Sequence, residues 1–77
     1  MKLENFIQLL ESDVFETLDS GTLKPETKFV ELEEWDSLIV LSLIAMVDTE
    51  FGVNLNVDEI NASENIDQLF KLIQKSK

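Results

Sequence analysis

Residues 35–51 read WDSLIVLSLIAMVDTEF. From Leu38 to Phe51 this stretch runs almost unbroken as Leu, Ile, Val, Met and Ala, whereas residues 31–35 before it show no clear amphipathic period. Asp36 is a good N-cap residue because its carboxylate accepts hydrogen bonds from the free N–H groups of a first helical turn. We therefore expect a helix from Ser37 to about Phe51, ended by Gly52. Ser37 would be its first residue, at the positive end of the helix dipole, where unpaired N–H donors favour a phosphate.

Apolar periodicity predicts another helix before this segment. Residues 2–18 carry an apolar stripe at intervals of three and four residues: Leu3, Phe6, Ile7, Leu10, Val14 and Leu18. We expect Asp19-Ser20-Gly21 to end this helix, with Gly21 in the left-handed cap conformation. Residues 19–36 then form a long connection, a kind of loop that often carries function. Four apolar side chains are expected to pin it to the core: Leu23, Phe29, Val30 and Leu32.

Two further helices are expected after Gly52. Asn56 and Glu59 have the spacing of a capping box, which predicts about one helical turn. A last helix should begin after Asn65, with Gln68 at the reciprocal capping position and an inward face formed by Ile66, Leu69, Phe70 and Ile73. Residues 53–57 alternate like a strand, but a lone strand has nothing to pair with. The fold class is thus all-α: a small four-helix bundle of three longer helices and one short helix, with residues 1–77 as one domain.

Composition excludes several kinds of function. The chain has 77 residues without Cys or His, which removes disulfides, thiolate metal sites and the usual general base. Six basic and 16 acidic residues give a net charge of −10, which repels nucleic acid and anionic membranes and favours basic protein partners. The apolar run of the second helix is too short to span a bilayer, and no signal peptide is evident. We expect a cytoplasmic monomer that is not an enzyme.

The residues around Ser37 resemble the acyl carrier proteins and the related peptidyl carrier domains. An Asp-Ser-Leu triplet begins the second helix in that family, and Asp36-Ser37-Leu38 stands at this place. The resemblance extends over nearly the whole chain, through Phe29-Val30-Glu31, Glu50-Phe51-Gly52-Val53, Asp58-Glu59-Ile60 and Asn65-Ile66-Asp67-Gln68-Leu69. It implies an acyl-carrier-like bundle with a long loop between helices 1 and 2.

The resemblance also implies a function. Ser37 would carry a 4′-phosphopantetheine arm, placed there by a phosphopantetheinyl transferase, and Asp36 would serve as helix cap and in transferase recognition. Acyl or aminoacyl groups would travel on the arm as thioesters between acyl-loading and acyl-processing enzymes. The expected protein is a discrete carrier. A second interpretation is a small acidic helical adaptor that binds a basic protein and carries no prosthetic group.

Two features depart from the family's usual pattern. Trp35 and the two glutamates before it replace the common Leu-Gly-x, and Trp35 is interpreted either as a hydrophobic staple packed on Val40 or as a partner anchor. The second helix lacks the acidic residues usual along its exposed face. Leu43, Ile44, Val47 and Phe51 fit an inward stripe, which leaves an apolar patch for partner binding: Leu38, Ile39, Leu41 and Ala45.

These departures favour a specialised pathway over the housekeeping carrier of fatty acid biosynthesis. The cargo would be a modified fatty acid, a polyketide, an aminoacyl group or a surface-glycan building block. The acidic residues Glu31, Glu33, Glu34 and Asp36 cluster within six positions, but their spacing fits no EF-hand loop. No specific metal site is expected.

Overall fold

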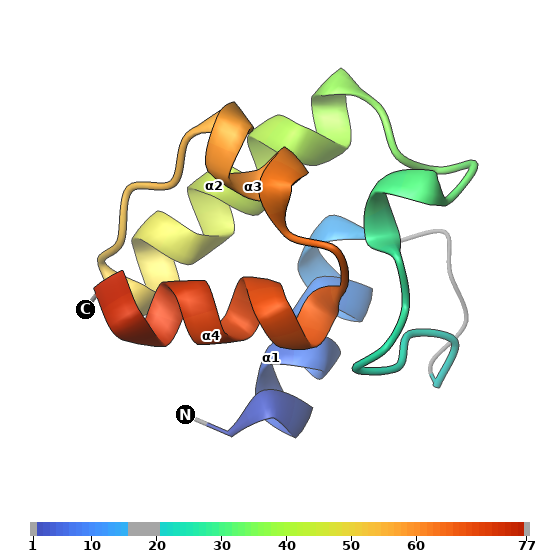
Figure 1. The fold of residues 1–77 in the computed structure, drawn as a ribbon, viewed down its shortest axis with the longest axis horizontal. Helices are drawn as coiled ribbons and strands as arrows, with labels where there is room; N and C mark the ends of the chain where they lie inside the picture. Colours follow the sequence, from blue (N-terminus) through green and yellow to red (C-terminus); the bar gives the residue numbers. More distant parts are fainter. Residues whose placement is uncertain (1, 16–20, 77) are drawn as a thin grey trace.

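The computed structural model describes residues 2–15 and 21–76. Its helices are α1 (Leu3–Leu9), α2 (Ser37–Phe51), α3 (Val57–Ala62) and α4 (Ile66–Ser76), with a π-helical turn η1 (Leu10–Val14) directly after α1 and a 3-10 turn η2 (Phe29–Glu31) in the long connection (Figure 1). None of the residues 2–15 and 21–76 lies in a β-strand. The all-α fold with three longer helical stretches and one short helix is confirmed.

The first helical stretch ends earlier than its apolar stripe predicts. Phe15 leaves the helical conformation, with φ −98° and ψ 65°, and its ring is buried. Its N–H donates to the carbonyl of Leu10, five residues back, at 2.7 Å. A continuous helix over residues 2–18 is therefore wrong, because the chain turns at Phe15 to bury the ring. Leu18 itself, like Asp19 and Ser20, lies outside the described residues.

The carboxylate of Glu11 holds the start of the connection. Its Oε2 atom accepts hydrogen bonds from the N–H groups of Gly21 at 2.8 Å and Leu23 at 3.1 Å. Gly21 has the expected positive φ, at 89°. Its expected role as a helix cap is wrong, since η1 has already ended at Val14. The glycine instead forms the turn that meets Glu11.

The rest of the connection is pinned to the core and to α4. Leu23 and Phe29 are buried, and Val30 and Leu32 pack against the core, as expected. The carbonyl of Pro25 accepts from the N–H of Asp67 at 2.9 Å, and a second carbonyl, that of Thr27, accepts from the N–H of Ile66 at 3.2 Å. The first N–H groups of a helix have no partner within the helix. The connection therefore caps α4 while α4 holds the connection.

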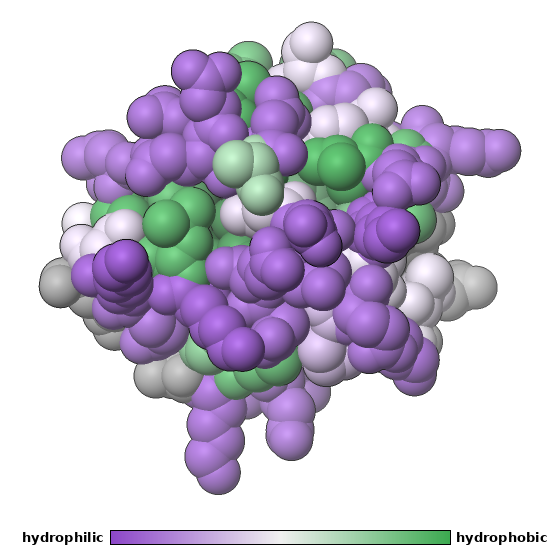
Figure 2. Space-filling view, in the orientation of Figure 1, coloured by the Kyte–Doolittle hydropathy of each residue, from purple (hydrophilic) through white to green (hydrophobic). Residues whose placement is uncertain are grey.

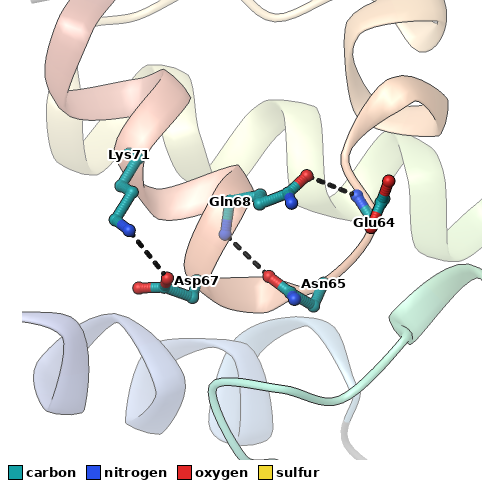
Figure 3. Close-up of polar contacts among 5 residues, drawn as sticks. All are labelled: Glu64, Asn65, Asp67, Gln68 and Lys71. Atoms are coloured by element: carbon teal, nitrogen blue, oxygen red, sulfur yellow. Dashed lines mark hydrogen bonds and ion pairs between the residues drawn. The ribbon is translucent and has the colours of Figure 1, made fainter.

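Side-chain caps begin α3 and α4 at the predicted residues. The capping box at α3 has both of its bonds, between Asn56 and Glu59, at 2.8 and 3.1 Å. At α4 the side chain of Asn65 accepts from the N–H of Gln68 at 2.9 Å (Figure 3). The amide oxygen of Gln68 accepts from the N–H of Glu64 at 3.1 Å rather than from that of Asn65. The reciprocal bond at α4 is thus displaced by one residue from the predicted capping box.

Aromatic rings join the helices in the core. Phe6 of α1 is fully buried and lies against Phe51 at a ring-centroid distance of 5.8 Å and against Phe70 of α4 at 5.4 Å. The buried side chains of α2 are Leu43, Met46 and Val47, while Ile44 and Phe51 are half-buried. Each fully buried side chain of this size contributes about 1.5–3 kcal/mol through removal of its apolar surface from water. Helix packing therefore holds a fold that has no disulfide.

The outer surface is mostly hydrophilic. Figure 2 shows polar side chains over most of one face, with apolar side chains reaching the surface in a few separate places. Within the described part of the chain, no helix has the length and apolar character needed to cross a membrane.

An exposed ion pair on α4 joins Lys71 to Asp67 at 3.0 Å (Figure 3). Exposed pairs of this kind contribute little, so most of the charge of −10 acts as self-repulsion.

We expect the midpoint of thermal unfolding (Tm) to rise with salt. Screening between low salt and about 0.3 M NaCl should relieve repulsion worth about 1 kcal/mol, which raises the Tm of a domain this small by roughly 5 °C. Differential scanning calorimetry measures the shift. The exposed double variant Glu26→Gln/Glu33→Gln, with two charges fewer, should show a smaller rise. A Tm that stays constant with salt in the native sequence would contradict this expectation.

Candidate functional site

The loop before α2 ends in a well-formed helix cap. Asp36 has extended backbone angles, φ −153° and ψ −176°. Its Oδ1 atom accepts from the N–H of Ile39 at 2.9 Å, and its carbonyl accepts from the N–H of Val40 at 3.0 Å. Gly52 ends the same helix in the left-handed conformation, with φ 69°. The predicted bounds of α2, and Asp36 as its N-cap, are confirmed.

Ser37 is the first residue of α2 and is exposed. The cap engages the N–H of Ile39, whereas the N–H groups of Ser37 and Leu38 have no acceptor among residues 2–15 and 21–76. Free donors at a helix start attract anions, through both the N–H groups and the helix dipole. The hydroxyl of Ser37 is therefore accessible to another protein and lies beside donors that suit a phosphate.

An exposed apolar surface follows the serine on α2. Leu38 is 74% exposed and Leu41 63%, and Ala45 is exposed as well. Ile39 departs from the expectation because it is half-buried and packs against the core. It precedes the buried Leu43 by four residues, and this spacing places both side chains on the inward face of the helix. The exposed part of the predicted patch is thus Leu38, Leu41 and Ala45.

Val57 extends this surface from a second helix. It is the first residue of α3 and is 47% exposed. A hollow of about 260 Å³ lies between the two helix starts and is lined by Ser37, Val40 and Leu41 of α2 and by Val57. Sequence reasoning missed Val57. No local pattern signals its exposure, since Ile66, the first residue of the capped helix α4, is fully buried. We call Leu38, Leu41, Ala45 and Val57 the apolar patch.

Trp35 is half-buried immediately before the cap. Its indole stacks on the ring of Phe15, with centroids 6.2 Å apart and planes at 27°. A second ring, that of Phe29, meets it edge-on at 5.2 Å and 66°. The ring contacts of Trp35 are thus with the residue after η1 and with η2. Neither the predicted staple with Val40 nor the predicted partner anchor is tested by these contacts.

Several carboxylates precede Ser37 in the loop that leads to α2. Glu31, Glu33 and Asp36 are exposed, and Glu34 is half-buried. Within residues 2–15 and 21–76, acidic side chains form no group of three or more that could hold a metal ion. The site therefore has two unlike halves, an acidic loop before the serine and the apolar patch after it.

One comparison with known proteins gives a match over most of the chain. A family model described as "phosphopantetheine attachment site" matches residues 7–73. No curated protein matches the chain, and no solved structure does. The matched range includes the whole of α2 and both halves of the site around Ser37.

We expect Asp36→Ala to destabilise the protein by about 1 kcal/mol, because the N–H of Ile39 loses its acceptor. Asp36→Asn is the matched control, since asparagine caps about as well and removes only the charge. Urea unfolding followed by circular dichroism gives both free energies of unfolding. A loss as large for Asp36→Asn as for Asp36→Ala would mean that the charge of Asp36, rather than its hydrogen bond, stabilises α2.

Proposed function

The chain belongs to the family of phosphopantetheine attachment-site domains, non-catalytic carriers with a covalent 4′-phosphopantetheine arm, and on this premise we propose that Ser37 bears the arm. The supporting observation is an exposed hydroxyl at the first position of α2, next to two N–H groups without an acceptor among the described residues. An attached phosphodiester would keep its charge near these donors. Trp35, Ile39 and Val40, next to the cap, are half-buried and pack against the core, which holds the start of α2 to the rest of the bundle.

A phosphopantetheinyl transferase would make the attachment, since carriers of this family generally interact with such an enzyme. The Ser37 oxygen would form a bond to the phosphorus of coenzyme A that carries the pantetheine. The bond from that phosphorus to the nucleotide oxygen would break, and adenosine 3′,5′-bisphosphate would leave. The proton of the hydroxyl would pass to a base of the transferase. When bound, the arm supplies a thiol on which cargo is held as a thioester.

We further propose that partner enzymes bind the apolar patch. Exposed Leu38 and Leu41 lie one helical turn apart on α2, and Val57 adds to them across the hollow. Contiguous apolar surface of this kind marks interaction sites. No acidic residue occurs on α2 before Asp48, so charge along this helix offers a partner little near the serine. The exposed carboxylates of the preceding loop would steer a basic partner, and the apolar patch would hold it.

We propose that the carrier is cytoplasmic and dedicated to a specialised pathway, and the apolar patch supports the second of these points. Enzymes that load or process acyl groups on this carrier would present apolar side chains toward α2 and basic side chains toward the loop. The competing function is an adaptor that binds a basic protein without any arm. The two differ in one covalent property, the mass of the protein after exposure to a transferase and coenzyme A.

Incubation with coenzyme A and a broad-specificity transferase should add one phosphopantetheine to the chain, and Ser37→Ala should abolish the addition. Intact-mass spectrometry measures the product. Ser42→Ala is the matched control, because Ser42 is an exposed serine on the same helix and should not affect loading. An unchanged mass for the native chain would reject the carrier function, and loading of Ser37→Ala would reject this attachment residue.

Replacing Leu41 with Glu should lower kcat/KM for loading by the same transferase about tenfold, because a charge would enter an apolar contact. Lys75→Gln is the control, since it changes the net charge equally at an exposed position on α4. The salt dependence separates the two halves of the site. If kcat/KM of Leu41→Glu equals that of the native chain, and both fall steeply with NaCl, the transferase reads charge rather than the apolar patch.

A further inference from the structure

Trp35 is the only tryptophan in the chain, and its ring contacts two other aromatic rings, one 20 residues and one six residues earlier in the sequence. It ends the long connection, whereas its ring partners come from the residue after η1 and from η2 itself. Both partner rings, Phe15 and Phe29, are 1% exposed, so each is fixed by the core. We call these three residues the aromatic clamp. The indole is thereby held against two rigid surfaces, at 6.2 and 5.2 Å.

Backbone hydrogen bonds connect the aromatic clamp to the segment that contains Ser37. The N–H of Leu32 donates to the carbonyl of Phe29 at 3.2 Å, and the N–H of Trp35 donates to the carbonyl of Leu32 at 3.0 Å. Two successive turns therefore connect Phe29 to Trp35. The next residue is Asp36, which caps α2, and Ser37 follows. Only one peptide unit separates the clamped residue from the cap.

The cap alone is weakly protected. Asp36 and Ser37 are exposed, and the carboxylate bond to the N–H of Ile39 is open to water. Terminal turns of helices fray, and a single capping bond, worth about 1 kcal/mol, stabilises the first turn without fixing it to the rest of the molecule. A fixed residue immediately before the cap limits the backbone conformations that Asp36 can adopt. The aromatic clamp thus gives the first turn of α2 a defined direction, which Asp36 by itself does not supply.

We propose that Trp35 is a positioning residue for the modification of Ser37, acting through the cap rather than by contact with the transferase or the arm. This inference rests on the proposed function, in which the Ser37 oxygen attacks phosphorus. Such reactions depend steeply on placement, and a displacement of about 1 Å can cost as much as a hundredfold in rate. Loss of the indole does not alter the Ser37 hydroxyl itself, but it lets the backbone of Asp36 and Ser37 move.

Three variants test the proposal. Trp35→Ala removes the indole, and Trp35→Phe keeps a ring that can meet Phe15 and Phe29. Phe70→Ala is the matched control, because it removes an aromatic contact with Phe6 between α4 and α1. Each variant is assayed at a temperature at which circular dichroism shows it fully folded. The measurements are kcat and KM for loading from coenzyme A, and the hydrogen-exchange rate of the Ile39 amide.

Trp35→Ala should lower kcat about tenfold with little change in KM, since ground-state binding is retained while placement is lost. The Ile39 amide should exchange faster in the same variant. Trp35→Phe should recover most of both values, and Phe70→Ala should leave both unchanged. If Trp35→Ala does not fold, Trp35→Leu replaces it, because leucine keeps apolar volume without a stacking ring.

Two results would overturn the proposal. One is loading of Trp35→Ala at the native kcat with native exchange at Ile39. The other is an equal loss of kcat in Phe70→Ala, which would make the effect one of general stability. If the native chain is not loaded at all, the proposed function fails instead. In that case, unaltered exchange of the Ile39 amide in Trp35→Ala still rejects the clamp, and faster exchange supports its mechanical part.

Discussion

The carbonyls of Pro25 and Thr27 accept hydrogen bonds from the first N–H groups of α4, while Leu23 and Phe29 are buried beside them. These contacts hold a long connection that has little helical structure of its own. Fixing each of its residues costs about 1–2 kcal/mol of backbone entropy, which only burial and hydrogen bonding can offset. Everything downstream depends on this anchoring, because the connection delivers Asp36 and Ser37 to the start of α2. A free loop of the same length would leave the first turn of α2 capped by Asp36 but joined to the rest of the molecule by a mobile segment.

Helix α2 has more apolar side chains than the bundle can bury. With 15 residues the helix is about 22 Å long, most of the 29 Å length of the molecule. A helix packed on one side can bury only one stripe, here centred on Leu43 and Val47. The remaining apolar side chains stay in water at Leu38 and Leu41, at a cost in solubility. The net charge of −10 offsets this cost, and the proposed partner surface gives the exposed residues a use.

Local signals made much of the fold predictable. The caps at Asp36, Asn56 and Asn65 each depend on residues within four positions, and all three begin helices where the sequence predicts. The end of the first helix was not predictable in this way. It depends on burial of Phe15 and on a bond from Glu11 to Gly21, ten residues away. Such contacts exist only once the bundle has formed, so an apolar stripe alone extends the helix too far.

Some features of the candidate site follow from neighbouring residues in the sequence, and others follow only from tertiary packing. The position of Ser37 at the head of a capped helix follows from its neighbours, and the sequence predicted it. Ile39 was assigned to the surface because the run around it is apolar on all sides, and only packing shows which face turns inward. The ring partners of Trp35 come from residues 20 and six positions away, beyond any capping motif.

The difference between local capping and tertiary contacts matters for a carrier. A flexible arm must move between enzymes, whereas the backbone at its attachment residue must stay fixed. Motion of that backbone would displace the Ser37 oxygen from its required position in every partner enzyme. Local capping orients one turn of helix, but only contacts from remote segments can fix that turn relative to the rest of the molecule. The aromatic clamp brings such contacts to within two residues of Ser37. We therefore regard the departure from Leu-Gly-x before the serine as a stiffening of the base, and the exposed leucines beyond it as the surface that partners meet.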